Sequence, residues 1–174
     1  MPENLQLINP VGTIGEFYQV NSFFGWRKHP VTGELSYHKG IDIPAPKGTI
    51  IRSSLPGLVV LSSFSQSAGN YIIIEHHGGY KTKYMHLSSR LVDKGQVVKE
   101  GDPIGIIGAT GRVTGVHLHF ELHKDGEPID PLDYYNNSTR NNPYAPDKIN
   151  FLPWLIGGTV LTSLFIIYKN QRKN

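Results

Sequence analysis

A row of histidines alternates with apolar residues in the segment VHLHFELHK at residues 116–124. Alternate side chains of a β-strand project from the same face, so the apolar residues of this segment would face a core. The opposite face would carry the polar set His117, His119, Glu121 and His123. Side chains two residues apart on a strand start roughly 6–7 Å apart, so two imidazoles can reach one ion or one substrate group. The same row could also be ordinary solvated surface.

A second group of candidate ligands lies in the sequence HKGID, which contains His38 and Asp42. A neutral imidazole and a carboxylate both suit zinc, and a catalytic zinc site typically takes three protein ligands and keeps a fourth position for water. Such spacing also arises by chance, so a surface histidine and a turn aspartate are the alternative. His86, in YMHL, is a further candidate that could equally be a partly buried structural histidine.

The elements that must position these residues read as short strands. Apolar runs are separated by Pro-Gly, Gly-Gly and Asp-Gly turn signals, and no long stretch of the body has a 3.6-residue period. Strands are expected within residues 48–61, 71–75, 80–85, 103–108 and 116–124. The sequence therefore predicts a mainly β domain. An antiparallel β-sheet with a metal-binding groove is what the resemblance described below implies for it.

Composition excludes several classes of protein. The chain has 174 residues and no cysteine, which excludes a disulfide scaffold, a thiol nucleophile and a cysteine-ligated metal. Residues 1–146 carry 13 basic and 13 acidic side chains, so the body offers no electrostatic reason to bind nucleic acid. The basic excess belongs to residues 147–174.

The C-terminal region differs from the body. Residues 151–168 (FLPWLIGGTVLTSLFIIY) are uncharged and would span roughly 27 Å as a helix, close to the thickness of a bilayer core. The alternative is a buried helix or strand of a globular domain. Residues 134–150 are rich in Asn and Pro and read as a linker. The start of the chain has no signal-peptide pattern, whereas the basic end of the chain favours a cytoplasmic C-terminus, so the orientation in a membrane stays open.

Taken together, these blocks resemble peptidase family M23, the lysostaphin-type or LytM-like zinc metallopeptidases that cut peptidoglycan. The resemblance runs from about residue 23 to 132 and includes FGWR at 24–27, HKGIDI at 38–43, TKYMHLS at 82–88 and GVHLHFE at 115–121. The resulting organisation is a lead-in (1–22), a peptidase domain (23–133), a linker (134–150), a transmembrane helix (151–168) and a basic tail (169–174).

The resemblance implies a role for each candidate. One Zn²⁺ per chain would be held by His38, Asp42 and His119, and His117 and His86 would line the cleft beside it as catalytic residues. We expect His117 to take a proton from water and pass it to the leaving amine, and His86 to steady the tetrahedral intermediate by a hydrogen bond. Which of the two histidines is the general base stays open.

Other residues have weaker claims. Asn70 and Tyr84 are candidate substrate contacts, with a turn residue and a packing aromatic as the alternatives. Glu121 is a candidate partner for a ligand histidine, or else a solvent-facing residue. His123 is expected to be structural or exposed.

The function expected from this resemblance is a zinc endopeptidase that cleaves peptide bonds in bacterial peptidoglycan. The C-terminal helix would anchor it in a lipid membrane, either in a bacterial envelope or in the virion of a membrane-containing phage. The alternative is a catalytically silent, membrane-anchored scaffold or adaptor that uses the same β-domain. The complete set of candidate ligands weighs against that alternative.

Overall fold

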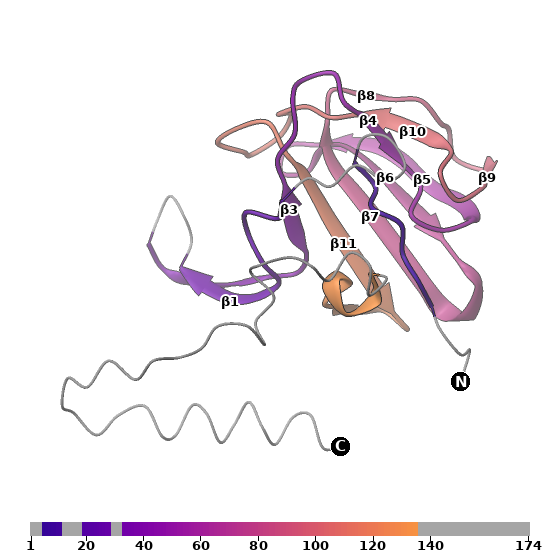
Figure 1. Ribbon diagram of the computed structural model, residues 1–174. Helices are drawn as coiled ribbons and strands as arrows, with labels where there is room; N and C mark the ends of the chain where they lie inside the picture. The colour runs from indigo at the N-terminus through magenta and orange to yellow at the C-terminus, as the bar shows by residue number, and fades with distance from the viewer. Residues whose placement is uncertain (1–4, 12–18, 29–32, 136–174) are drawn as a thin grey trace, which may run out of the picture. The chain divides into compact units, whose positions relative to one another are not determined.

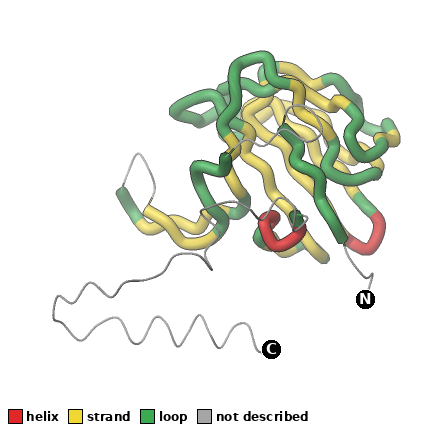
Figure 2. Tube along the Cα trace, in the orientation of Figure 1, coloured by secondary structure: helices red, strands yellow, loops and turns green. Residues whose placement is uncertain are grey.

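A computed structural model describes residues 5–11, 19–28 and 33–135, whose regular structure is almost entirely antiparallel β-sheet (Figures 1 and 2). The largest sheet has seven strands in the order β12-β11-β7-β6-β5-β9, with β3 also paired to β11. These strands are β3 (Ile41–Ile43), β5 (Gly57–Ser65), β6 (Gly69–Glu75), β7 (Tyr80–Leu87), β9 (Val97–Val98), β11 (Leu118–Lys124) and β12 (Glu127–Ile129). The predicted mainly β, antiparallel fold is confirmed.

The other regular elements in the described part of the chain are two smaller sheets and two short 3₁₀ turns. The first sheet joins β4 (Ile50–Arg52), β10 (Pro103–Ile106) and β8 (Ser89–Arg90), and the second is a hairpin of β1 (Gly25–Lys28) and β2 (Leu35–His38). The turns are η1 (His77–Gly79), which connects β6 to β7, and η2 (Pro131–Tyr134). Within these described residues, no helix is long and apolar enough to cross a bilayer. The predicted span at 151–168 lies outside the described residues.

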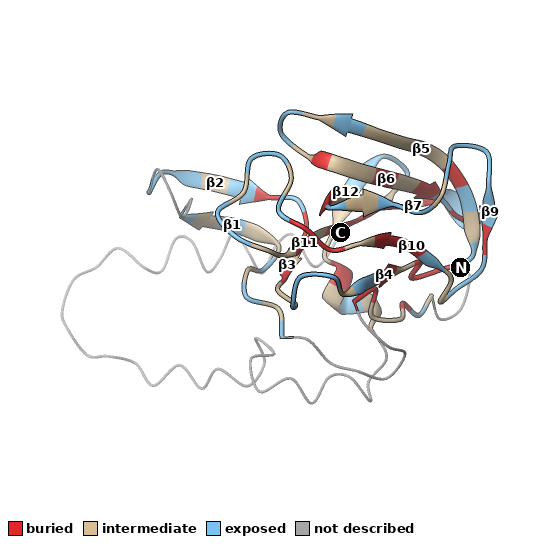
Figure 3. Cartoon of the chain, turned by 90° about the horizontal axis from the view of Figure 1, so that it is seen from above, coloured by how far each residue is buried: buried red, intermediate tan, exposed pale blue. Residues whose placement is uncertain are grey.

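Alternating burial along the strands builds the core. On β7 the buried positions alternate with partly exposed ones (red and tan in Figure 3), as expected for a strand whose two faces meet different surroundings. On β11, Leu118, Phe120 and Leu122 are fully buried, so the predicted apolar face is confirmed. Phe120 packs against Tyr84 with ring centroids 5.3 Å apart.

The opposite face of β11 is more enclosed than a solvated surface would be. Glu121 and His123 on this face are only 5% and 8% exposed. Gly40 covers this part of the strand, because a Cβ added there would overlap the backbone of Phe120 and touch the side chain of Glu121. The interpretation of this row as ordinary solvated surface is therefore wrong.

Residues at both ends of the predicted peptidase domain also belong to the fold. Leu7 and Val11, from the predicted lead-in, are buried in the core. Leu7 pairs with Tyr135, which lies in the predicted linker, and Val11 pairs with Ile51. The folded unit thus includes residues on either side of the limits expected at 23 and 133.

Candidate metal centre

Three of the predicted residues meet at one point where β2, β3 and β11 come together. His38 ends β2, Asp42 is the middle residue of β3, and His119 lies on β11 directly opposite Asp42. The distances are 3.2 Å from His38 Nε2 to Asp42 Oδ1, 3.0 Å from His38 Nε2 to His119 Nδ1, and 2.8 Å from His119 Nδ1 to Asp42 Oδ1. Tetrahedral zinc with bonds of about 2.0–2.1 Å separates its ligand atoms by about 3.3 Å. The three atoms therefore form a triangle close to the one that a zinc ion requires, and slightly smaller.

Backbone pairing explains why Asp42 is held at this point. Its strand is pinned on both sides, by β11 and by the N-terminal segment, where Asp42 N–H donates to the Ser22 carbonyl and Asn21 N–H donates to the Asp42 carbonyl. Gly40 allows the turn between His38 and Asp42 to lie directly on β11, because any larger residue would overlap the Phe120 carbonyl. Asp42 is therefore held by two other segments of the chain at once.

Each ligand histidine makes a hydrogen bond through its other ring nitrogen. His38 Nδ1 lies 2.8 Å from the Phe23 carbonyl oxygen, and His119 Nε2 lies 3.1 Å from Glu121 Oε1. A carbonyl or carboxylate oxygen can only accept, so the ring nitrogens that face Phe23 and Glu121 carry protons. The remaining nitrogens, His38 Nε2 and His119 Nδ1, face each other and Asp42 Oδ1. A metal ion that displaced the proton they share with Asp42 would meet an imidazole lone pair from each ring.

The electrostatics of the cluster favour a cation at this point. Burial disfavours the charged form of Asp42, but hydrogen bonds with His119 and His38 outweigh it and hold the pKa of the carboxyl well below its usual range. Burial opposes the charged form of His119, but hydrogen bonds with Asp42 and Glu121 raise its pKa to about 9. Burial also disfavours the charged form of Glu121, but hydrogen bonds with His119 and His123 outweigh it and lower the pKa of Glu121 to about 2, so this carboxylate stays ionised.

The two predicted catalytic histidines lie beside the triangle. The ring of His86 is 5.1 Å from that of His117 and 6.0 Å from that of His119, centroid to centroid, and His117 Nε2 is 3.7 Å from Asp42 Oδ1. His86 has a positive φ of 65°, which is unusual outside glycine and is found where surrounding contacts impose it. The structure therefore brings all five predicted histidine and aspartate residues into one cluster.

Each of the two predicted catalytic histidines bonds a backbone carbonyl through Nδ1, which leaves Nε2 as the acceptor nitrogen. His86 Nδ1 donates to the Thr110 carbonyl at 2.9 Å, and His117 Nδ1 donates to the Gly115 carbonyl at 3.1 Å. Burial is the main cause that lowers the pKa of both rings, to about 4 for His86, so both are neutral near pH 7. A neutral ring with its proton on Nδ1 can accept a proton at Nε2 but cannot donate one there. The predicted role of His86 as a hydrogen-bond donor is therefore unavailable until that ring gains a proton.

The two predicted substrate contacts, Tyr84 and Asn70, both hydrogen-bond to the protein's own backbone. Tyr84 is fully buried, and its hydroxyl accepts a hydrogen bond from the Ser54 N–H at 2.9 Å, so its prediction as a substrate contact is wrong. Asn70 donates from its side-chain amide to the carbonyls of Leu87 and Ser88, at 3.1 and 3.2 Å. Asn70 thus fixes the chain that follows His86, and its contact with substrate stays a prediction.

Two further residues contribute to the site: Thr110, which the sequence analysis missed, and Arg27, for which it left open a place near the groove or a surface ion pair. Thr110 holds His86 through its carbonyl, while its hydroxyl donates to the Leu87 carbonyl at 2.6 Å and accepts from the Asn70 N–H at 2.9 Å. Arg27 places Nη2 3.7 Å from Asp42 Oδ2, and no residue in the described part of the chain hydrogen-bonds to its buried Nε. The motif FGWR contains this arginine, but only the structure shows which residue it faces.

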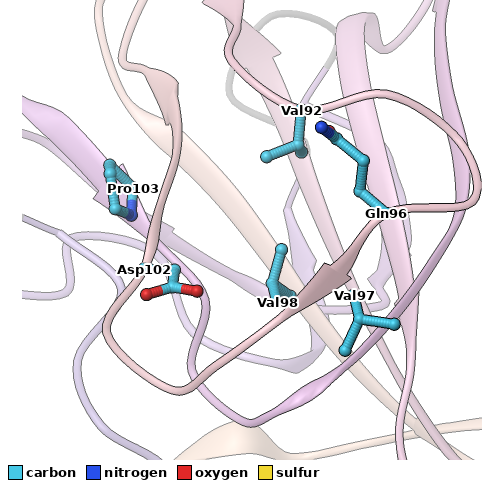
Figure 4. Close-up of a pocket in the computed structure, with 6 residues that line it drawn as sticks. All are labelled: Val92, Gln96, Val97, Val98, Asp102 and Pro103. Atoms are coloured by element: carbon cyan, nitrogen blue, oxygen red, sulfur yellow. The ribbon is translucent and has the colours of Figure 1, made fainter.

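A surface hollow of about 340 Å³ lies away from these residues (Figure 4). It is lined by Val92, Gln96, Val97, Val98, Asp102 and Pro103. None of these is a histidine, and a single carboxylate cannot supply a zinc ligand set. This hollow therefore offers no metal site, whereas the convergence of ligand atoms at His38, Asp42 and His119 does.

Comparison with known proteins agrees with this geometry. The model of peptidase family M23 matches residues 36–131. Peptidoglycan DD-endopeptidase ShyB of Vibrio cholerae is 46% identical over 117 residues, which cover 67% of this chain and 28% of that protein. Peptidoglycan DD-endopeptidase ShyC of the same organism is 49% identical over 112 residues, covering 64% of this chain and 26% of that protein. The chain thus spans about a quarter of the length of these curated relatives.

Solved structures are similar as well. A zinc-containing peptidase from Vibrio cholerae superimposes with a TM-score of 0.66 at 43% identity, over 73% of this chain and 40% of that one. The catalytic domain of the antimicrobial peptidase lysostaphin from Staphylococcus simulans gives a TM-score of 0.61 at 31% identity, over 67% of this chain and 91% of that one. Because the family model covers the strands that carry all three ligand atoms, the chain belongs to peptidase family M23.

Proposed function

We propose that this chain is a zinc-dependent endopeptidase that hydrolyses peptide bonds in bacterial peptidoglycan. The triangle of His38 Nε2, Asp42 Oδ1 and His119 Nδ1 is the observation that carries the proposal. Two imidazoles and one carboxylate form a set that suits a catalytic zinc ion. The named activity of the relatives ShyB and ShyC supports peptidoglycan as the substrate.

The chain's own residues would move the protons of hydrolysis. A bound zinc ion would acidify a water molecule and polarise the scissile carbonyl. His117 accepts the water proton at Nε2 as oxygen bonds to the carbonyl carbon, and then delivers that proton to the leaving amine as the C–N bond breaks. We assign the base to His117 because its Nε2 lies 3.7 Å from Asp42 Oδ1, beside the ligand triangle.

His86 has a supporting part in this scheme. Its Nε2 also accepts, because the Thr110 carbonyl holds the ring proton on Nδ1. It can therefore take a hydrogen bond from the water or from the substrate amide, and it becomes a donor only after protonation. The Thr110 and Gly115 carbonyls keep the two rings in place, so neither has to reorient before it accepts.

The test combines metal analysis with product analysis. The full chain should hold about one zinc per molecule and release defined muropeptides from purified cell walls, identified by mass spectrometry. His119→Ala should lose both zinc and cleavage and keep its fold by circular dichroism. His77→Ala is the matched control, because His77 is exposed on η1 and contacts none of the ligands. Full cleavage by His119→Ala, or a wild-type chain without zinc, contradicts the proposal.

We also propose that residues 151–168 anchor the chain in a lipid membrane, in a bacterial envelope or a membrane-containing phage virion, with residues 134–150 as the tether. The proposal rests on the uncharged length of the segment. Flotation of the full chain with lipid vesicles tests it, with Leu161→Arg as the variant expected to reduce flotation. Equal flotation of both chains, or of neither, contradicts it.

A further inference from the structure

We propose that Glu121, held by Lys83 and His123, is a positioning residue that selects the ring nitrogen His119 offers to the metal. The inference rests on the proposed zinc site and deepens it. It concerns side chains that lie behind the ligand, on the side away from the point where the three ligand atoms meet.

The contacts form a continuous chain along one face of β11. Glu121 Oε1 lies 3.1 Å from His119 Nε2, and Glu121 Oε2 lies 2.6 Å from His123 Nε2. Lys83 Nζ approaches Glu121 Oε2 at 3.0 Å from β7, where Lys83 is directly opposite Glu121 in the sheet. Both carboxylate oxygens therefore have partners, and the three β11 residues share one face because they are two positions apart.

Because Glu121 is buried, its carboxylate needs these contacts to compensate for the loss of water. The side chain of Glu121 is 7% exposed, and a buried carboxylate is costly unless its oxygens are paired. Gly40 lies against its Cγ and leaves it little room to move. The turn after β11 fixes the far end of the chain, since His123 Nδ1 lies 3.2 Å from the Gly126 carbonyl. Glu121 is thus locked in one position relative to His119.

Two carboxylates compete for the ring proton of His119. Asp42 Oδ1 faces Nδ1 at 2.8 Å, and Glu121 Oε1 faces Nε2 at 3.1 Å. With the proton on Nδ1, the ring could not bind a metal beside Asp42 and His38. Glu121 provides the acceptor that keeps the proton on Nε2, which leaves the Nδ1 lone pair for the cation. Without it, Asp42 would be the sole carboxylate that contacts His119 among the described residues.

Glu121→Gln is the direct test, because it keeps the shape of the side chain and removes its charge. We expect zinc affinity, measured by competition with a chromophoric chelator, to fall about 10–100-fold. Glu75→Gln is the matched control, because it removes another Glu–Lys pair of the same sheet, Glu75 Oε1 to Lys81 Nζ at 3.3 Å, and touches no ligand. The control should bind zinc as the wild type does.

A spectroscopic measurement separates positioning from a loss of stability. Long-range ¹H–¹⁵N correlation of the His119 ring should report a proton on Nε2 in the zinc-loaded wild type. In Glu121→Gln, that Nε2 signal should weaken or exchange, whereas it should be unchanged in Glu75→Gln. A merely structural role for Glu121 would lower the melting temperature without changing the ring signal.

A second variant keeps the inference testable if Glu121→Gln does not fold. Lys83 is 26% exposed and can be replaced by Met, which removes one partner of Glu121 and leaves the carboxylate in place. We expect a smaller loss of zinc affinity for Lys83→Met than for Glu121→Gln, with the fold retained. Unchanged affinity in every folded variant overturns the inference. A wild-type chain that binds no zinc instead overturns the proposed function, so the two failures are distinguishable.

Discussion

Buried histidines lie near both ends of strand β7, His86 within the strand and His76 in the turn before it, but only one end has the chemistry of a metal site. At the end near Leu87, His86 joins His117 beside the ligand triangle. At the other end, His76 is 7% exposed, with Nδ1 2.8 Å from the Pro56 carbonyl and Nε2 2.7 Å from the Thr82 hydroxyl. Burial and residue type are the same at both ends.

The difference lies in what the second ring nitrogen faces. His76 is bonded at both nitrogens, so it joins the residue before β5 to β7 and has no nitrogen left for a ligand. At the site, one nitrogen of His38 and of His119 faces an acceptor outside the ligand triangle, and the second nitrogens of these rings face each other and Asp42. The ligand histidines therefore differ from His76 in that their second nitrogens meet other candidate ligands, which one cation could bind together.

Removing a metal ligand should have the largest effect and would confirm the contrast most directly. Asp42→Asn keeps the shape of the side chain and removes the charge that His38 and His119 share. We expect cell-wall cleavage to fall to background and zinc content, measured by mass spectrometry, to drop well below one per chain. His76→Asn should retain zinc. If both variants lost zinc equally, the two ends of β7 would not differ as described.

Replacing His117 should slow the chemical step without removing the metal. His117→Asn should lower kcat about 10²–10⁴-fold, because it removes a group that transfers protons, while zinc content stays at the wild-type level. His86→Asn is the comparison that settles which ring is the base. If His86→Asn shows the larger loss of kcat, the assignment of the base to His117 is wrong.

Gly40→Ala should damage the site by crowding instead of by removing a ligand. The added methyl group would overlap the Phe120 carbonyl, so we expect a loss of about 1–3 kcal/mol in the free energy of unfolding, together with weaker zinc binding. Gly115→Ala is the control, because a Cβ there meets nothing within 4 Å. Urea unfolding and zinc competition should be measured for both variants. Equal unfolding free energies for Gly40→Ala and Gly115→Ala would show that position 40 does not require glycine.

The smallest expected effect is a pH dependence at the structural end of β7. Burial lowers the pKa of His76 below its unfolded value near 6.5, so the unfolded chain binds the proton more readily. The stability that the neutral ring contributes is therefore complete above pH 6.5 and is lost as the pH falls toward the folded pKa. Relative to His76→Gln, the wild type should lose at most about 1.4 kcal/mol per pH unit in that window. A gap in unfolding free energy that stays constant from pH 7.5 to 5.5 would contradict this.

Much of the fold and most of the metal site could be predicted from the sequence. The alternation at residues 116–124 predicted the apolar face of β11, and His38, Asp42 and His119 do converge. Tyr84 was misassigned because the sequence does not show whether an aromatic residue next to a site motif faces the cleft or the core. The enclosure of Glu121 was missed because the residue that covers it, Gly40, is distant along the chain.

The amino-acid sequence by itself determined which side chains could bind a cation or a proton, and the period of two that puts the β11 histidines on one face. Only the tertiary structure decided which nitrogen of each ring is available. That choice depends on the carbonyls of Phe23, Thr110 and Gly115 and on the carboxylate of Glu121. Every residue type offers the same backbone carbonyl, so no sequence pattern marks the ones that will face an imidazole once the chain has folded.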